Sequence, residues 1–143
     1  MANHTFDNAL IPWQTLAGFD HLHYYILNID QANTVIDVLF KFAAQQQIVL
    51  HRHKALNHTL VIQGEHRLYR PEGTLKEVRA VGSYTVSPPS DEPHREGGGD
   101  VDAMVFFSIR GSGVLYDILD DDLNTVATLG FADFIGLYQQ QGA

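Results

Sequence analysis

Short runs of apolar and β-branched residues, separated by turn-forming residues, recur along the 143-residue chain. Their pattern predicts strands at His23–Leu27, Thr34–Phe42, Gln47–Leu50, Thr59–Gln63, His66–Tyr69, Val78–Ala80, Ser83–Val86, Val101–Ile109, Val114–Ile118 and Thr125–Leu129. Glycine, proline and Asp-Asn clusters between these runs suit tight turns. Many short strands at close spacing favour a barrel or a sandwich over alternating βαβ units, so the expected class is all-β.

The C-terminal residues follow a different pattern. Ala132–Gln140 places Phe134, Ile135 and Tyr138 at helical spacing, which predicts a short helix that packs on the strands or on a partner. The glycine run Gly97–Gly99 opens no helix and is interpreted as a flexible loop. The length, and the lack of a repeat or linker, predict a single domain over residues 1–143.

Composition excludes several classes of function. Acidic residues outnumber basic ones by 17 to 9, and the formal charge of −8 argues against a nucleic-acid partner. The sequence contains no cysteine, so any metal must be held by nitrogen and oxygen ligands. No basic segment followed by an apolar stretch marks a signal peptide, and no apolar run approaches the ~20 residues of a membrane span. We therefore expect a cytoplasmic protein without a membrane partner.

Two histidines stand one residue apart at the end of an apolar run. Residues i and i+2 of a strand point to the same face, so the imidazoles of His51 and His53 project together. Two imidazoles on one face can meet one metal ion. Same-face histidines also occur without a metal, so this pair alone leaves both interpretations open.

A third histidine, His94, follows the proline-rich segment Ser87–Pro93. Such a turn fixes the backbone and can aim one side chain inward. Taken singly, a histidine here is more often a surface or packing residue than a ligand.

The surroundings of these histidines resemble the two sequence motifs of the cupin superfamily. The first motif, HxH followed by a glutamate and then a glycine, resembles His51–Gly64, and the second, Gly followed by Pro-x-Gly and His, resembles Gly82–His94. The second has one extra residue before its histidine and carries Ser90 where glycine is usual. This resemblance, within residues 50–94, implies a single cupin (double-stranded β-helix, or jelly-roll) barrel with a metal on His51, His53 and His94.

The glutamate of the first motif is missing. Its place falls on Asn57 when counted back from Gly64, and on His58 when counted forward from His53 with the longer gap. We therefore expect three neutral imidazoles around the metal, with His58 either a fourth ligand, a hydrogen-bond donor to a ligand, or a strand residue that faces the barrel wall.

The three-histidine pattern resembles the acetylacetone-cleaving and 2,4'-dihydroxyacetophenone dioxygenase-like cupins. This resemblance implies an Fe(II) dioxygenase that cleaves a C–C bond in a small β-dicarbonyl or hydroxyketone with O₂; Zn, Ni and Mn are the alternative metals. The pattern also overlaps the cupin modules of ChrR-type anti-sigma factors, which implies the alternative of a non-catalytic metal- or small-molecule-binding cupin. A metal-dependent sugar isomerase is a weaker alternative, because the sequence lacks a basic cluster for phosphorylated ligands.

Residues at inward positions of the expected strands would line a substrate pocket. They are Trp13, Val61 (or its neighbour Leu60), Tyr69 and Phe106. No catalytic residue can be assigned. Arg70 could orient an anionic substrate, although an exposed, solvated arginine is the better explanation. Glu92 could hydrogen-bond an imidazole and is equally well explained as an exposed turn residue. Because cupin barrels expose edge strands, we expect a homodimer or a larger homo-oligomer.

Overall fold

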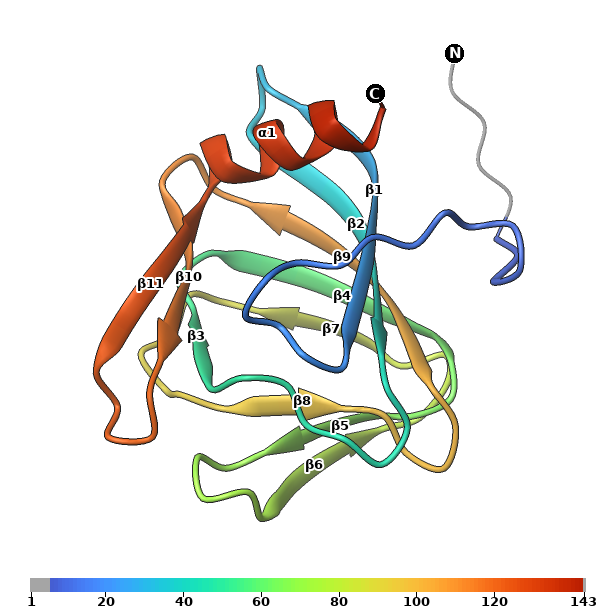
Figure 1. The fold of residues 1–143 in the computed structure, drawn as a ribbon, viewed down its shortest axis with the longest axis vertical. Helices are drawn as coiled ribbons and strands as arrows, with labels where there is room; N and C mark the ends of the chain where they lie inside the picture. The colour runs from blue at the N-terminus through green and yellow to red at the C-terminus, as the bar shows by residue number, and fades with distance from the viewer. Residues whose placement is uncertain (1–5, 143) are drawn as a thin grey trace.

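The computed structural model describes residues 6–142. The elements follow one another along the chain as β1 (Leu22–Asp30), β2 (Val35–Phe42), β3 (His51–His53), β4 (Leu56–Gln63), β5 (His66–Tyr69), β6 (Leu75–Arg79), β7 (Tyr84–Ser87), β8 (Arg95–Gly97), β9 (Ala103–Arg110), β10 (Val114–Leu119), β11 (Thr125–Gly130) and α1 (Phe131–Gln141) (Figure 1). The expectation of a mostly β chain that ends in a short helix is confirmed.

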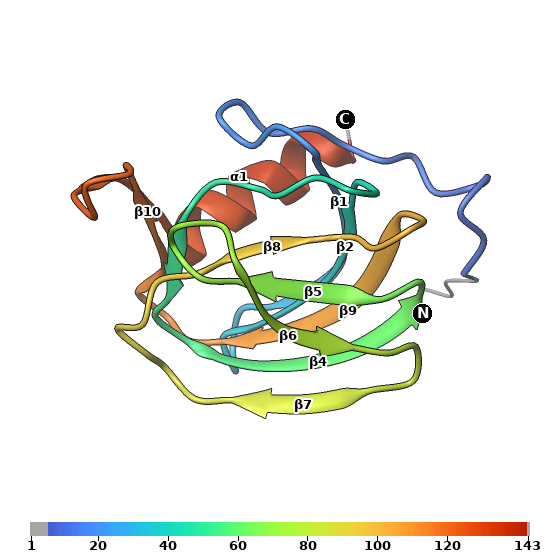
Figure 2. The same cartoon turned by 90° about the horizontal axis from the view of Figure 1, so that it is seen from below.

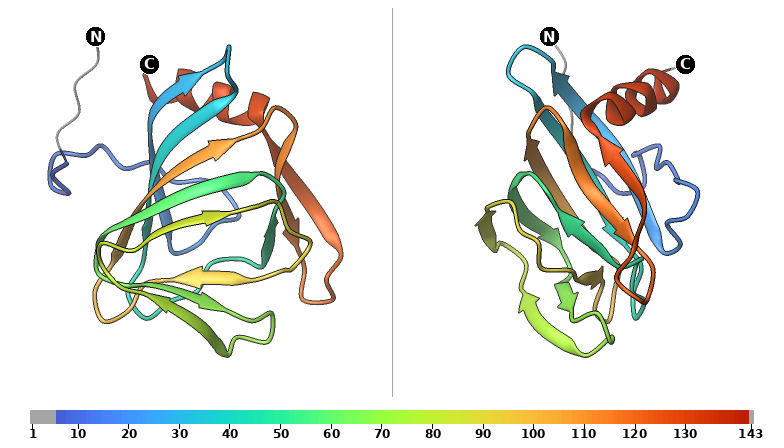
Figure 3. Two further views of the ribbon diagram at one scale, coloured as in Figure 1. Left: turned by 180° about the vertical axis from the view of Figure 1, so that it is seen from behind. Right: turned by 90° about the vertical axis from the view of Figure 1, so that its left-hand side faces the viewer.

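The strands form three sheets. A five-stranded antiparallel sheet has the order β1-β2-β9-β4-β7, and its strands lie side by side in the left view of Figure 3. The other two sheets have the orders β11-β10-β3 and β6-β5-β8. Among the described residues the hydrogen-bonded pairing leaves each sheet open, so the single closed barrel stays a prediction.

The core lies against the inner face of the five-stranded sheet. Alternate residues of β2 and β9 point inward, as the period of two in a strand requires. The fully or almost fully buried residues of these two strands are Ile36, Val38, Phe42, Ala103, Met104, Val105, Phe107 and Ile109. Helix α1 and part of the segment 6–21 lie on the same side of the five-stranded sheet (Figure 2). Phe131 and Phe134 of the helix join the same core. In residues 6–142, no helix combines the length and the apolar character that crossing a bilayer requires.

The segment that contains Gly97–Gly99 is not the flexible loop that the sequence suggested. Gly97 belongs to β8, and all three glycines are buried. A Cβ atom on Gly97 would lie 1.9 Å from the backbone oxygen of Gln46, and one on Gly98 would lie 2.8 Å from that of Phe42. Glycine is required here because two backbone segments approach each other too closely for a side chain.

Candidate metal centre

Two short backbone segments bring three histidines together. His51 and His53 are the ends of β3, and both side chains are buried on the same face. His94 directly precedes β8 and pairs with His51 through two backbone hydrogen bonds of 3.1 and 3.0 Å. The expectation that His94 approaches the HxH pair is therefore matched by the backbone pairing, which places the third imidazole opposite the other two.

The reactive nitrogens of the three histidines converge on one point. The Nε2 atom of His53 lies 3.1 Å from Nε2 of His51 and 3.1 Å from Nε2 of His94. A metal about 2.1 Å from each nitrogen holds neighbouring ligand atoms about 3.0 Å apart in an octahedron and about 3.4 Å apart in a tetrahedron. The spacing of these nitrogens fits a common metal ion.

Glu96, in β8, completes the group. Its Oε2 atom lies 2.6 Å from Nε2 of His51, 3.1 Å from that of His53 and 3.4 Å from that of His94. Ligand atoms of the four residues all lie within 4.8 Å of one another, close enough to hold one metal ion. The cluster therefore has a carboxylate in addition to the three imidazoles that the sequence predicted.

The hydrogen bonding of His51 fixes the direction of its lone pair. Its Nδ1–H donates to the carbonyl oxygen of Val49 at 2.7 Å, so Nε2 of the neutral ring has no hydrogen. This lone pair faces both a carboxylate oxygen and another imidazole nitrogen. Acceptor atoms gathered in this way repel each other unless a cation lies between them, so the donor set fits a metal ion.

His66 forms a hydrogen bond with one carboxylate oxygen of Glu96. It is fully buried on β5, and its Nε2–H donates to Glu96 Oε1 at 2.7 Å. Its ring stacks on Phe42, with ring centres 4.9 Å apart. His66 therefore fixes the orientation of Glu96 and leaves the second carboxylate oxygen directed at the three histidines.

The electrostatics of the cluster keep its donor atoms available. Burial lowers the pKa of His53 to about 4 and also lowers the pKa of His94, although the negative charge of Glu96 opposes both shifts. Burial alone would raise the pKa of Glu96, but its electrostatic interaction with His53 and the hydrogen bond that His66 donates place it well below its usual range. Near neutral pH the site thus offers neutral His53 and His94 and an ionised Glu96.

A polar cavity of about 140 Å³ lies on one side of the cluster. Three of the four clustered residues line it: His53, His94 and Glu96. Its other lining residues are Asn57, Thr59, Leu68, Lys76, Glu77, Arg79, Ser87, Pro88, Ser90 and Glu92. Lys76 is ion-paired with Glu92, and Arg79 with Glu77, so the charges around this cavity are largely balanced.

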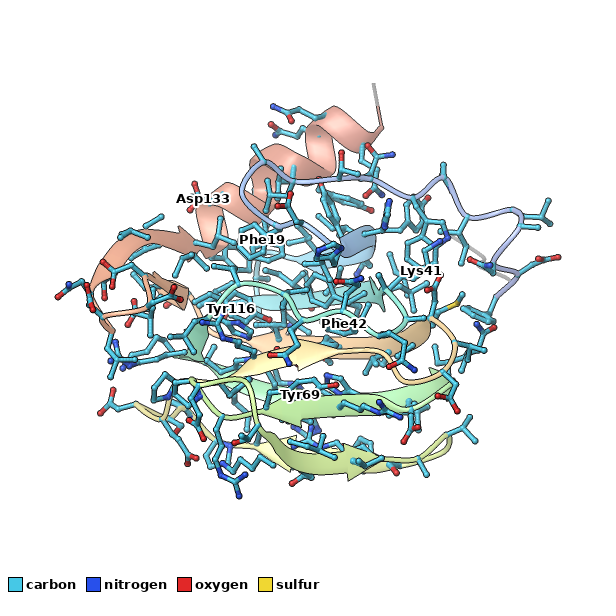
Figure 4. All side chains as sticks on the ribbon, turned by 60° about the horizontal axis from the view of Figure 1, so that its bottom comes forward. Phe19, Lys41, Phe42, Tyr69, Tyr116 and Asp133 are labelled. Atoms are coloured by element: carbon cyan, nitrogen blue, oxygen red, sulfur yellow. The ribbon has the colours of Figure 1, made fainter. Side chains whose placement is uncertain are left out.

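An apolar cavity of about 40 Å³ reaches the same cluster from the side of helix α1. His51, Glu96 and Tyr116 contribute to its wall, and the remaining lining is almost entirely aliphatic and aromatic. Burial, with the nearby charge of Glu96, raises the pKa of Tyr116 well above its usual range. Tyr116 and Phe42 both line this cavity, and Figure 4 shows both between helix α1 and the strands below it.

Asn57 and His58, the two positions on which the missing glutamate could fall, point to opposite faces of β4. Asn57 points inward and lines the polar cavity, whereas His58 is half-buried on the outer face, where it is hydrogen-bonded to Tyr84. The structure therefore places His58 away from the cluster. Its position follows from the alternation of side chains along the strand.

The other residues singled out from the sequence lie apart from the cluster or only at the rim. Arg70 is exposed and donates to the backbone oxygen of Leu75, and Glu92 is paired with Lys76 at the rim of the polar cavity. The four expected pocket residues line neither cavity at the cluster. Trp13 lies under the ammonium of Lys41, Val61 is in the core, Tyr69 is half-buried on β5, and Phe106 lines a separate outer groove.

Sequence comparison gives no relative for this chain: no protein-family model matches it, and no curated protein matches it. Solved structures do resemble it. An RmlC-like cupin protein from Ralstonia eutropha is 20% identical, with a TM-score of 0.74 over 98% of this chain and 87% of that one. An acetylacetone dioxygenase from Acinetobacter johnsonii is 15% identical, with a TM-score of 0.72 over 99% and 94%.

A third similar structure is a regulator. The complex of SigE with the anti-sigma ChrR from Rhodobacter sphaeroides matches with 20% identity and a TM-score of 0.57, over 72% of this chain and 50% of that one. At these identities the comparisons establish the fold alone. The chain has the cupin fold, with the four-residue cluster between two cavities.

Proposed function

We propose that this cupin-fold chain binds one divalent transition metal through His51, His53 and His94, with Glu96 as a fourth donor, and that the loaded protein is an Fe(II) dioxygenase. The substrate would be a small β-dicarbonyl or hydroxyketone, cleaved at a C–C bond. The observation that carries the proposal is the convergence of the three Nε2 atoms and one carboxylate oxygen, with the lone pair of His51 directed among them.

The chain's own residues would prepare the site for this chemistry. Iron would supply Lewis acidity and one-electron chemistry with O₂ when bound. The hydrogen bond to Val49 and the hydrogen bond from His66 hold His51 and Glu96 in place before any ligand arrives. The polar cavity, lined by His53 and His94, would receive the chelating oxygens of the substrate. The apolar cavity beside His51 would exclude water.

One observation favours the alternative, a non-catalytic zinc-binding module. Four protein donors can close a tetrahedral site completely, and closed four-coordinate sites are typical of structural zinc. Iron accepts six ligands, so the same four donors would leave two positions for substrate and O₂. The coordination number thus separates the two functions.

Oxygen uptake tests the proposal. The protein would be loaded anaerobically with Fe(II) and mixed with acetylacetone or a hydroxyketone in an oxygen electrode, with the zinc-loaded protein as the matched control. We expect uptake of O₂ that depends on both iron and substrate. A correctly loaded protein that consumes no O₂ with any member of either substrate class would contradict the dioxygenase and support the binding module.

The expected homodimer is a separate proposal. Strand β7 ends the five-stranded sheet, and Tyr84 and Val86 on it are exposed. Sedimentation velocity of the purified protein measures its mass directly; a species of twice the chain's 16.0 kDa is expected, and a monomer at all concentrations would contradict it.

A further inference from the structure

Two polar atoms in the wall of the polar cavity are buried without a protein partner. Within residues 6–142, neither a side chain nor a backbone group forms a hydrogen bond with Oδ1 of Asn57 or with Oγ1 of Thr59. The residues are 1% and 2% exposed, respectively. Leaving such a group unsatisfied costs about 1–3 kcal/mol, so two of them side by side call for an explanation.

The direction of the Asn57 amide is fixed. Its Nδ2 donates to the backbone oxygen of Ala55 at 3.0 Å, which turns Oδ1 away from that contact. A carbonyl oxygen only accepts, so Oδ1 needs a donor such as an O–H or N–H group. The hydroxyl of Thr59 can both donate and accept.

Both residues line the same cavity as the metal-binding cluster. Asn57 and Thr59 are two residues apart on β4, so their side chains point inward together, and both line the cavity that His53, His94 and Glu96 also line. Lys76 is paired with Glu92 and Arg79 with Glu77. The remaining charged residue of the cavity, Glu96, faces the histidines of the metal-binding cluster. What the cavity lacks is a neutral donor.

We propose that Asn57 and Thr59 are specificity residues that bind a hydroxyl group of the ligand, so that the ligand is a hydroxylated carbonyl compound and not a purely apolar diketone. This inference rests on the proposed metal site, because the carbonyl end of the ligand would chelate the metal. The ligand's hydroxyl donates to Oδ1 of Asn57 and accepts from the hydroxyl of Thr59. A site built in this way discriminates strongly against an analogue that lacks the hydroxyl, because its buried polar atoms then stay unpaired.

Two chelators that differ by a single hydroxyl test the proposal. Kojic acid and allomaltol share the same hydroxypyrone chelating group, and kojic acid carries a hydroxymethyl group where allomaltol has a methyl. Their affinities for the anaerobic, Fe(II)-loaded protein would be measured by calorimetry after the metal content has been determined. We expect kojic acid to bind at least ~10-fold more tightly than allomaltol.

Variants assign the preference to these residues. Thr59→Val keeps the shape and removes the hydroxyl, and we expect it to reduce the affinity ratio to about one; Thr59→Ser should retain the preference. Asn57→Leu should also reduce the ratio, provided that circular dichroism shows a folded protein. Thr128→Val, which removes an exposed hydroxyl on β11, is the matched control and should leave the ratio unchanged.

The outcomes separate this inference from the function on which it rests. Equal affinities for the two chelators, or a preference that Thr59→Val leaves intact, would overturn the role of Asn57 and Thr59 while the metal site stands. Tighter binding of allomaltol would place the ligand in the apolar cavity instead. A wild-type protein that takes up no metal would overturn both the proposed function and this inference.

Discussion

Acid should destabilise the metal-free protein through the buried histidines of the cluster. In the folded chain, burial lowers the pKa of His53 from the ordinary 6.5 to about 4. In the unfolded chain the same imidazole is in water and has its ordinary pKa. Between these two values the unfolded state binds a proton that the folded state does not, so the free energy of unfolding falls as the pH falls.

The size of this effect follows from the two pKa values. One pKa unit corresponds to about 1.4 kcal/mol, so His53 alone should remove at most ~3 kcal/mol of stability between pH 7 and pH 4. The lowered pKa of His94 acts in the same direction. Glu96 acts in the same direction only at the acid end of this range, because its pKa is also lowered and its contribution begins to be lost as the pH falls towards the ordinary pKa of a glutamate.

Urea denaturation of chelator-treated protein at a series of pH values measures the effect. The matched control is His53→Gln, which removes the titrating group at that position and should show a slope smaller by about 1 kcal/mol per pH unit between pH 6 and pH 4.5. A wild-type stability that is flat across this range, or a variant with the same slope as the wild type, would refute the assignment of a buried, neutral His53.

Three substitutions test other parts of the account. Glu96→Gln removes the negative charge beside the three imidazoles, and we expect metal affinity to fall about 10- to 100-fold in a competition titration; an unchanged affinity would show that Glu96 is not a donor. His58→Ala removes a side chain from the outer face of β4, so the metal content measured by elemental analysis should stay at the wild-type value. The free energy of unfolding should change by less than ~0.5 kcal/mol. Loss of metal in this variant would show that His58 is a ligand. Gly97→Ala forces a Cβ against the backbone of Gln46 and should cost about 3 kcal/mol of unfolding free energy, whereas Gly113→Ala, where the added atom meets nothing within 4 Å, serves as the control; equal costs would contradict the close approach.

The fold could be anticipated from the sequence because strand periodicity and turn residues are local signals. Strand β5 was predicted with its observed bounds, and helix α1 with an error of one residue at each end. The strand predicted at Gln47–Leu50 ends one residue before β3 begins, because Ile48 and Leu50 are buried without belonging to a sheet. Strand β8 was missed, since three consecutive glycines indicate a flexible loop unless the neighbouring backbone is known.

The candidate site was anticipated only in part. The resemblance of the HxH and proline-rich segments to the cupin motifs implied the three histidines that the structure brings together. Glu96 was overlooked because its segment was interpreted as a loop; had it been interpreted as a strand, His94 and Glu96 at i and i+2 would have shared a face in the way that His51 and His53 do. The contribution of His66 had no local signal, because it depends on how β5 packs beside β8.

Elemental analysis of the protein purified without added metal tests the central claim most directly. The wild type would be compared with a His51→Ala/His94→Ala double variant, and circular dichroism would confirm that both are folded. We expect about one equivalent of iron or another divalent transition metal in the wild type and none in the variant. A wild type that contains no metal and takes up none on incubation with Fe(II) or Zn(II), or a variant that retains a full equivalent, would contradict the three-histidine metal site.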